Sequence, residues 1–376
     1  MSTSFTLRGF RCLRSVLRGS GLLRHLLLLL GTYAVAHGES IPPGPGWHEI
    51  RATRLRAVCP QNGFGGSDYA FANYCPAVTA AWNSAVFDKL RNRLVVWGGG
   101  HNDYLGNELY ALDLNSMTVR RLTDPGLPVV QSGCPESLVN GTQANSRHTY
   151  DSITYVEHAD SMFVFGGSPG SPSGCFTRDT WSFSFITSTW ERRTPRGPIP
   201  GGTPGIVAVY DHVSRKVFVH DRTTLYAYDF EANRYKDLAS GSEIDYHMSG
   251  VIDPVRGKLV IVGAGHVHAY DIGPRSWYGR RTLKTTGGEF IVGSAYPGLA
   301  YDPVSDRIVA WNGGDTVYSL NLDSRVWSAV TFPGGPGKAA ETGTFKRWSY
   351  SPASGVFILV NSMDSNAFAF RLNVAK

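Results

Sequence analysis

Residues 85–122 read AVFDKLRNRLVVWGGGHNDYLGNELYALDLNSMTVRRL, and the same arrangement recurs five more times along the chain. A short apolar strand ends in Asp or Ser, a tight polar turn follows, and a second apolar strand runs into Gly or Asn. A third strand then carries an aromatic residue, and a fourth strand usually carries Trp. The other copies occupy residues 152–193, 207–238, 250–281, 299–330 and 349–373.

The repeat predicts the architecture. Copies of about 45 to 50 residues with four short strands and a Gly-Gly pair after the second strand are typical of the blades of a β-propeller. Positions equivalent to Phe87 recur at intervals of 42 to 68 residues, and the longer intervals contain loops. Turns such as DKLRNR and DPVRGK are rich in Asp, Pro, Gly and Ser, as connections between strands are. We therefore predict an all-β β-propeller whose blades contribute loops to one end of a central channel.

The two ends of the chain decide the number of blades. The sixth copy stops after its third strand, and residues 46–52 resemble the strands that end the other copies. Pairing this segment with the last copy would close the ring and remove exposed strand edges. We predict six blades in a single propeller domain over residues 37–376, closed by an N-terminal strand. A seventh blade would have to fit into residues 53–80, which are few for four strands and are predicted to form an insertion.

The first 36 residues have the character of a leader. Five arginines precede the short apolar run 26–30, and Ala34-Val35-Ala36 follows. This order is typical of a secretory signal peptide, and the run is shorter than the roughly 20 apolar residues that a membrane span needs. Without the leader the net charge of +6 falls to +1, so we expect no nucleic-acid partner. We expect a secreted or periplasmic protein, monomeric and without a membrane contact after cleavage.

Four cysteines remain after the leader, and an even number in an exported protein suggests two disulfides. Cys59 with Cys75 would staple the insertion. Cys134 with Cys175 would join two loops that leave the second blade on the same face. A zinc site is the alternative, but no paired Cys/His spacing supports it.

The geometry of a blade predicts which polar residues lie at the mouth of the channel. Adjacent strands are antiparallel, so the start of the first strand and the end of the second lie at the same end of a blade. Residues at these positions should surround one mouth of the channel. The polar, aromatic and cationic residues that we predict to bind substrate there are Trp82, Asn83, Asn102, Tyr104, Arg147, Arg222, Tyr296, Asn312, Arg347 and Trp348.

Histidine and tyrosine at the same positions are the catalytic candidates, because imidazole is the natural acid or base near neutral pH. The predicted catalytic residues are His101, His148, Tyr246 and His247. His101 follows three glycines, which let the backbone approach a ligand closely. In contrast, His220 and His268 occupy positions that are aromatic in other copies, so we predict that they pack in the core.

The Gly98-Gly99 and Gly166-Gly167 pairs, followed by the aromatic Tyr110 and Trp181, resemble kelch and galactose-oxidase-type propellers over about residues 46–376. The candidate residues are similar to those of propeller-fold lyases that cut ulvan and related uronate-rich polymers. This resemblance implies a secreted polysaccharide lyase that acts on an acidic polysaccharide or oligosaccharide by β-elimination.

In that chemistry a histidine removes the proton beside the uronate carboxylate, and Tyr246 or a second histidine protonates the leaving oxygen. An arginine among Arg147, Arg222 and Arg347, together with Asn102, would neutralise the carboxylate. No cofactor is required, and the need for a divalent metal is left open.

Two other classes are compatible with the repeat. The chain is similar in size to exported six-bladed kelch-like sialic acid mutarotases, and a sugar-binding module without lyase activity would use the same groups. A copper radical oxidase of the galactose oxidase type ranks last, because it needs a Tyr–Cys cross-link and the cysteines are assigned to disulfides. A glycosidase would need a carboxylate pair, and its candidates are Asp103, Asp221, Glu243, Asp245, Asp315 and Glu341.

Overall fold

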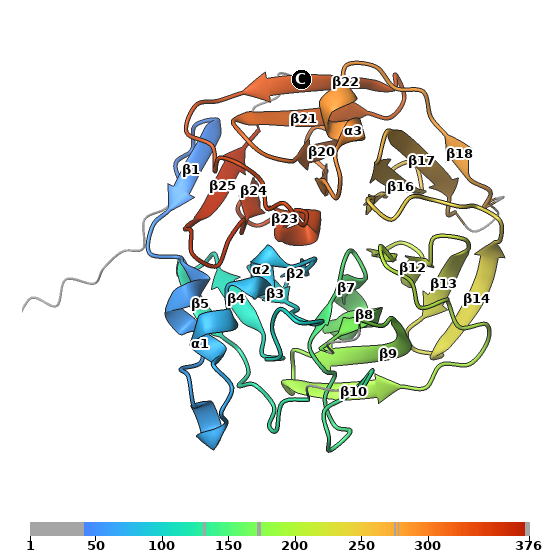
Figure 1. Cartoon of the computed structure of the whole chain (residues 1–376). Helices are drawn as coiled ribbons and strands as arrows, with labels where there is room; N and C mark the ends of the chain where they lie inside the picture. The colour runs from blue at the N-terminus through green and yellow to red at the C-terminus, as the bar shows by residue number, and fades with distance from the viewer. Residues whose placement is uncertain (1–40, 131–132, 171–173, 274–275, 277, 373–376) are drawn as a thin grey trace, which may run out of the picture. The chain divides into compact units, whose positions relative to one another are not determined.

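The computed structural model describes residues 41–130, 133–170, 174–273, 276 and 278–372. The predicted leader over residues 1–36 and Trp277 of the fourth copy lie outside the described residues. The described residues belong to one compact unit, Gly38–Lys376. Within it, six antiparallel sheets follow one another around a central channel (Figure 1), which confirms the six-bladed all-β propeller.

The first three sheets follow the first three sequence copies. Each runs outward from the channel in chain order, and a two-residue strand joins the inner end of the second sheet. Their strands are β2 (Ser84–Asp88), β3 (Arg93–Trp97), β4 (Tyr110–Asp113) and β5 (Thr118–Arg121); β6 (Arg147–His148), β7 (Ile153–Val156), β8 (Ser161–Pro169), β9 (Thr177–Ser184) and β10 (Thr189–Arg193); and β11 (Val207–Asp211), β12 (Lys216–His220), β13 (Leu225–Asp229) and β14 (Arg234–Ala239).

The last three sheets complete the ring. Their strands are β15 (Ser249–Asp253), β16 (Lys258–Gly263), β17 (His266–Asp271) and β18 (Arg281–Thr282); β19 (Gly298–Asp302), β20 (Arg307–Trp311), β21 (Thr316–Asn321) and β22 (Val326–Thr331); and β23 (Trp348–Ser351), β24 (Val356–Leu359) and β25 (Ala367–Arg371), completed by β1 (Gly46–Ile50). The sixth sheet therefore combines the two ends of the described chain.

The closing strand is held by register and by packing. β1 runs antiparallel to β25, with Gly46 opposite Arg371 and Ile50 opposite Ala367, and the two strands lie side by side in Figure 1. Trp47 packs on Phe370 with ring centroids 4.8 Å apart, and its indole N–H donates to the Asp315 carbonyl at 3.0 Å. These contacts confirm the predicted closure, because they join the N-terminal segment to both the sixth and the fifth blades.

The segment between β1 and β2 forms short helical turns, so it provides no seventh blade. Its elements are η1 (Leu55–Val58), η2 (Phe64–Gly66), α1 (Phe71–Tyr74) and α2 (Ala77–Ala80). The predicted Cys59–Cys75 disulfide joins two parts of this insertion, and Phe71 is fully buried in the core beside the first blade. The remaining short helices are η3 (Glu157–Ala159), α3 (Glu289–Gly293) and η4 (Phe345–Arg347).

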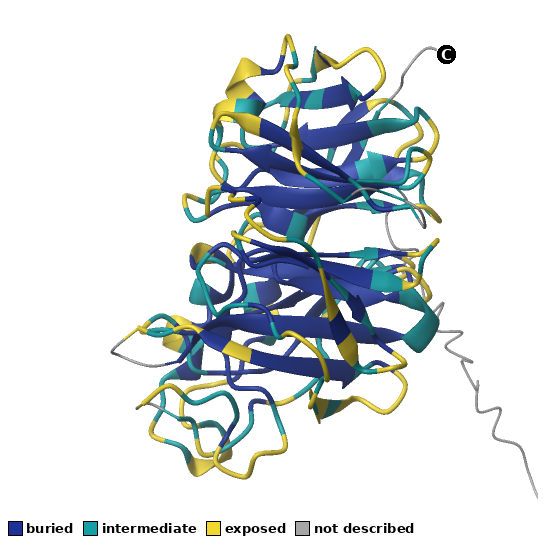
Figure 2. Cartoon of the chain, turned by 90° about the vertical axis from the view of Figure 1, so that its right-hand side faces the viewer, coloured by how far each residue is buried: buried dark blue, intermediate teal, exposed yellow. Residues whose placement is uncertain are grey.

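The hydrophobic core lies between neighbouring blades, because the strands are apolar on both faces (Figure 2). His220 confirms its predicted packing role. It is fully buried, its Nε2 lies 2.7 Å from the Tyr270 hydroxyl, and burial lowers its pKa to about 3. His268 is also buried, with its pKa lowered to about 4, again chiefly by burial. Both imidazoles are therefore neutral core groups.

The innermost strands surround a cavity of about 300 Å³ in the channel. The repeated position at Phe87, Tyr155 and Tyr301 lines it, as do the hairpin prolines Pro254 and Pro303. The cavity arises because six strands meeting around an axis leave a gap between their first turns.

Glu108 is a fully buried carboxyl beside the insertion. The hydroxyls of Tyr104 and Tyr110 both donate to its Oε1, and its Oε2 has no partner. Burial raises the pKa of Glu108 above its ordinary value, although the two hydroxyl donors oppose the shift. The folded chain therefore retains this proton to a higher pH than the unfolded chain does.

We expect Glu108→Gln to remove a pH dependence of stability. The contribution of Glu108 is complete below the ordinary carboxyl pKa of about 4.3 and is lost as the pH rises above it. Between pH 5 and pH 8, the free energy of unfolding of the wild type should fall relative to the variant, by up to about 1.4 kcal/mol per pH unit. Urea unfolding of the wild type and the variant at three pH values measures this difference. The same change of unfolding free energy with pH in both proteins would contradict a protonated Glu108.

Candidate functional site

An aromatic residue stands two or three positions before the innermost strand in five of the six blades. These residues are Trp82, Tyr150, Tyr246, Tyr296 and Phe345, and we name them the aromatic collar. Tyr296 lies against Phe345 and Tyr246, with ring centroids 4.9 and 6.2 Å apart, and Trp82 packs against the same cluster. The collar therefore gathers five blades at one end of the channel, the predicted mouth.

The first imidazole–carboxylate pair lies on the Trp82 side of the collar. The Nε2 of His148 lies 2.6 Å from the Asp103 Oδ2, and the ring packs between Trp82 at 5.3 Å and Tyr150 at 6.2 Å. The His101 ring is 5.8 Å away. β6 positions His148, because its pairing with β8 places His148 opposite Ser168. The pair thus consists of a nearly buried imidazole and a partly exposed carboxylate.

The second pair lies on the Tyr246 side. Asp245 Oδ1 is 2.6 Å from the His247 Nδ1 and accepts the His247 amide at 2.8 Å. Partial burial would raise the pKa of Asp245, but these hydrogen bonds outweigh it and hold that pKa below its usual value. Because Nδ1 faces the carboxylate, Nε2 is the nitrogen left for a ligand. The His247 ring packs on Tyr296 at 5.1 Å, and its side chain remains one-third exposed.

The buried Arg222 Nε near the second pair lacks a partner, whereas the buried Tyr296 hydroxyl interacts with the Trp82 side chain. The Arg222 guanidinium carbon lies 5.7 Å from the centre of the Tyr246 ring. Burial raises the pKa of Tyr296 above its usual value, and nearby Tyr246 and Tyr150 raise it further. An unsatisfied buried polar group costs about 1–3 kcal/mol, so the Arg222 Nε beside the mouth indicates a group that a ligand would satisfy.

The backbone around the mouth is strained. His101, Tyr150, Arg222, Tyr296 and Phe345 have φ values between 44° and 80°. Such left-handed conformations are uncommon for residues other than glycine. They cost about 1–3 kcal/mol each and cluster at binding and catalytic sites. Ten other described residues, mostly in hairpin turns, share this conformation, so the strain includes the collar, His101 and Arg222 without being confined to them.

The structure corrects five predicted binding residues, which it places in the interior: Asn83, Tyr104, Arg147, Arg347 and Trp348. Arg147 binds the Asp179 carboxylate at 2.9 Å and the Gly166 carbonyl at 2.8 Å. Arg347 donates to the carbonyls of Asn83 and Asn361. Asn83, Arg347 and Trp348 immediately precede or begin an innermost strand and pack between blades, whereas Arg147 lies in β6 and Tyr104 follows β3. The two arginines hold loops together through these hydrogen bonds.

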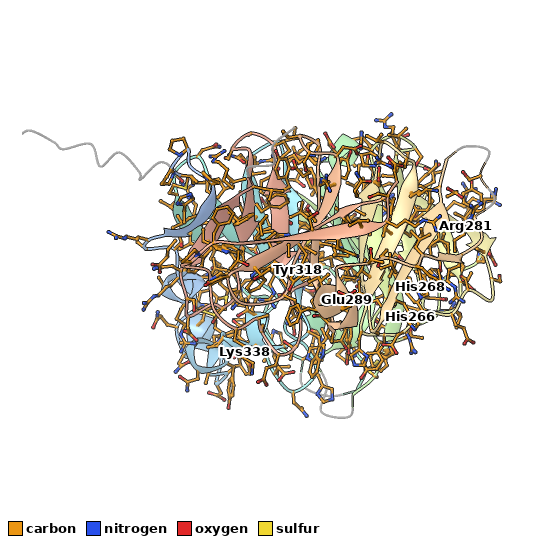
Figure 3. All side chains as sticks on the ribbon, turned by 90° about the horizontal axis from the view of Figure 1, so that it is seen from above. His266, His268, Arg281, Glu289, Tyr318 and Lys338 are labelled. Carbon is orange, nitrogen blue, oxygen red and sulfur yellow. A yellow bond between two sulfur atoms is a disulfide. The ribbon has the colours of Figure 1, made fainter. Side chains whose placement is uncertain are left out.

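Two further predicted residues lie outside the collar. Asn102 is exposed beside His101, in a cleft with residues of the insertion. Asn312 lines a separate cleft with Phe290 and Lys338. Lys338 is labelled in Figure 3, as is Glu289 of α3. The catalytic candidates His101, His148, Tyr246 and His247 lie on or beside the collar, and their roles stay predictions.

Tyr150 and Phe345 were missed from the sequence, although a signal for them existed. Both stand three residues before an innermost strand, as Tyr246 does, and aligning those positions would have found the collar. The carboxylate partners Asp103 and Asp245 were considered only as glycosidase candidates. Nothing in the sequence showed that Asp103 would reach His148 on the next blade.

The second predicted disulfide is confirmed. Cys134 and Cys175 join the two loops that leave the second blade near His101, with Cα atoms 6.0 Å apart. Disulfides persist in oxidising compartments, so both bridges are compatible with an exported protein. In the described part of the chain, no group of three His, Cys, Asp or Glu side chains could hold a metal ion, and no helix has the length and apolarity to cross a membrane.

The comparisons with known proteins concern the fold. No protein-family model and no curated protein matches the chain. Among 1153 matching chains of solved structures, one titled "Structure of YjhT" aligns with a TM-score of 0.50 and 11% identity. The alignment covers 77% of this chain and 93% of that one. At this identity the likeness shows a kelch-like propeller and leaves the function to the site.

Proposed function

We propose that this protein binds a reducing sugar at the aromatic collar and speeds the exchange of its anomers, which is a mutarotase activity. The observation that carries the proposal is the presence of two imidazole–carboxylate pairs on one aromatic mouth, His148 with Asp103 and His247 with Asp245. Trp82 and Tyr246, the collar rings that are not buried, suit the apolar face of a pyranose, and imidazoles suit proton transfer. The compact six-bladed kelch-like fold supports the same class.

Mutarotation needs one base and one acid, and it consumes nothing. His247 Nε2 takes the proton of the anomeric hydroxyl while His148 protonates the ring oxygen. The bond between the anomeric carbon and the ring oxygen breaks, and the anomeric carbon becomes a carbonyl. After rotation the former ring oxygen, now a hydroxyl, attacks the other face of the carbonyl and gives its proton back to His148, while His247 returns its proton to the anomeric oxygen. Positioned acid–base groups of this kind contribute about 10²–10⁴-fold to rate.

A lyase would use the same mouth but receives less support. β-Elimination needs a cation that neutralises the uronate carboxylate. Arg147 and Arg347 are fully buried with their donors committed to protein acceptors, which leaves Arg222 for that role. Arg222, with its unpartnered Nε, would bind the carboxylate of an acidic sugar in either reaction, so the weaker support for a lyase rests on the likeness of the fold.

One incubation separates the two activities. NMR exchange spectroscopy with N-acetylneuraminate, galacturonate and glucuronate measures anomer interconversion directly. We expect the purified protein to accelerate exchange of at least one of these sugars. Acid polysaccharides are incubated in parallel, and ultraviolet absorbance reports an unsaturated uronate. New absorbance without anomer exchange would replace the proposal with the lyase, and binding without either change would leave a lectin.

Arg222 should decide the preference for acidic sugars. Arg222→Gln is expected to weaken binding of the carboxylate-bearing sugar about tenfold or more, since a charged hydrogen bond contributes about 1.5–3 kcal/mol. Binding of the corresponding neutral sugar should change little. Titration calorimetry with galacturonate and galactose gives both constants, and Arg178→Gln serves as an exposed control. Equal weakening of both sugars would remove Arg222 from carboxylate recognition.

A further inference from the structure

We infer that the insertion between β1 and β2 forms a second sugar-binding site, in which a neutral pyranose stacks on Tyr74. This inference deepens the proposed function, on which it rests for the position of the first sugar at the collar. It specifies an oligosaccharide as the ligand, because the second site would bind the sugar unit that follows the one at the reducing end.

The aromatic platform consists of Tyr69 and Tyr74. Their rings are stacked, with centroids 5.5 Å apart and an interplanar angle of 29°. Tyr69 covers one face of Tyr74, while 52% of Tyr74 remains exposed. A large aromatic ring that is fixed in position and exposed on one face can pack against another apolar surface. Each pyranose has an apolar face of this kind.

The platform is rigid before any ligand arrives. The Leu105 amide donates to the Tyr69 hydroxyl at 2.9 Å, and the Tyr69 ring packs edge-on against the buried Phe71 at 4.8 Å. Cys75, which follows Tyr74, is bonded to Cys59. A surface ordered in advance loses little conformational entropy on binding, which favours affinity.

The cleft beside the platform has polar groups that suit hydroxyls. It encloses about 440 Å³ and is lined by Tyr69 and Tyr74 together with Asp68, His101 and Asn102. The carboxylate accepts hydrogen bonds from sugar hydroxyls, and the amide both donates and accepts. Asp68 would repel a uronate, so the preferred unit at this site is neutral. A few convergent polar groups beside aromatic side chains are typical of small-ligand sites.

His101 lies between the cleft and the first imidazole–carboxylate pair. Its side chain lines the cleft, and the same ring lies 5.8 Å from the His148 ring. A glycan whose reducing unit lies beside His148 would therefore bring its next unit past His101 and onto Tyr74. The insertion, which the ring closure does not need, acquires a role as an extension of the collar.

The test compares monosaccharides with trisaccharides on the full mature protein. NMR titration with glucose, galactose, mannose and N-acetylglucosamine, and with neutral β-linked trisaccharides of the same units, gives each dissociation constant. We expect at least one trisaccharide to bind about tenfold or more tightly than its monosaccharide. Tyr74→Ala should abolish this difference, whereas Tyr74→Phe should keep it because the ring face remains.

Phe290→Ala is the matched control, because Phe290 is also exposed and stacks on Tyr318 at 5.8 Å (Tyr318 is labelled in Figure 3). It should leave trisaccharide binding unchanged. Asp68→Asn should improve binding of trigalacturonate by removing the repulsion. A trisaccharide advantage that survives Tyr74→Ala, or no advantage for any trisaccharide, would overturn the second site.

The two proposals fail separately. Anomer exchange that is normal in Tyr74→Ala, with no trisaccharide advantage in the wild type, would remove the second site and keep the mutarotase. A Tyr74-dependent trisaccharide advantage in a protein that exchanges no anomers would support the second site and remove the mutarotase.

Discussion

Replacing Asp151 by asparagine is expected to destabilise the propeller by about 3–5 kcal/mol, because the change leaves a buried ammonium without its counter-ion. Asp151 precedes the innermost strand of the second blade and is almost fully buried. Its Oδ1 lies 2.6 Å from the Lys346 Nζ of the sixth blade, and its Oδ2 accepts the Gly250 amide of the fourth at 2.8 Å. Its backbone carbonyl accepts the Ala208 amide of the third blade. One residue thus joins four blades across the channel.

Urea unfolding of Asp151→Asn, Lys346→Met and the double variant measures the effect. The double variant should recover part of the loss, because it removes both charges together. Glu341→Gln is the control, since Glu341 pairs with Lys338 on the surface with both side chains 80% exposed, and such pairs contribute about 0–1 kcal/mol. If Asp151→Asn cost no more than Glu341→Gln, Lys346 would be solvated through the channel.

The largest effect on activity is expected at the two histidines. His247→Gln and His148→Gln should each slow the catalysed anomer exchange about 10²-fold or more, the contribution of a positioned acid or base. Glutamine keeps polarity and approximate size but cannot transfer a proton near neutral pH. The exchange rate measured by NMR, normalised to the fraction of sugar bound, separates lost chemistry from lost binding.

The carboxylate partners provide the matched comparison. Asp245→Asn and Asp103→Asn should lower the exchange rate by less than the histidine variants, because each carboxylate orients an imidazole without touching the sugar. His266→Gln is the control for an exposed histidine away from the collar, where it stacks with His268 at 5.4 Å (Figure 3). Unchanged exchange in both His148→Gln and His247→Gln would refute acid–base catalysis by these pairs.

Much of the fold could be predicted from the sequence, because each blade is a local unit. The apolar runs such as residues 94–97, the hairpin turns and the repeated copies all act between neighbours in the chain. The closing strand was also recognisable, since residues 46–52 resemble the fourth strand that the last copy lacks. Both disulfides followed from counting cysteines and from knowing which loops share a face.

The sequence predicted which face of the propeller carries the candidate site, but only some of the side chains that are exposed there. The face that carries His101, His148 and His247 follows from strand direction alone. Whether a side chain on that face points to solvent depends on the neighbouring blade, and the buried arginines show this. Arg147 and Arg347 lie on the predicted face of the propeller. Their side chains nevertheless point inward, where carbonyls and carboxylates of neighbouring segments bind them.

The sequence by itself therefore determined the six blades, their closure and the face on which the loops meet, since these depend on short-range patterns repeated along the chain. Only the tertiary structure decided which of the predicted side chains are buried, which carboxylate pairs with each histidine and that Asp151 joins four blades. Asp103 and His148 are 45 residues apart in sequence and 2.6 Å apart in space. Such pairings depend on the angle between blades, which no local pattern encodes.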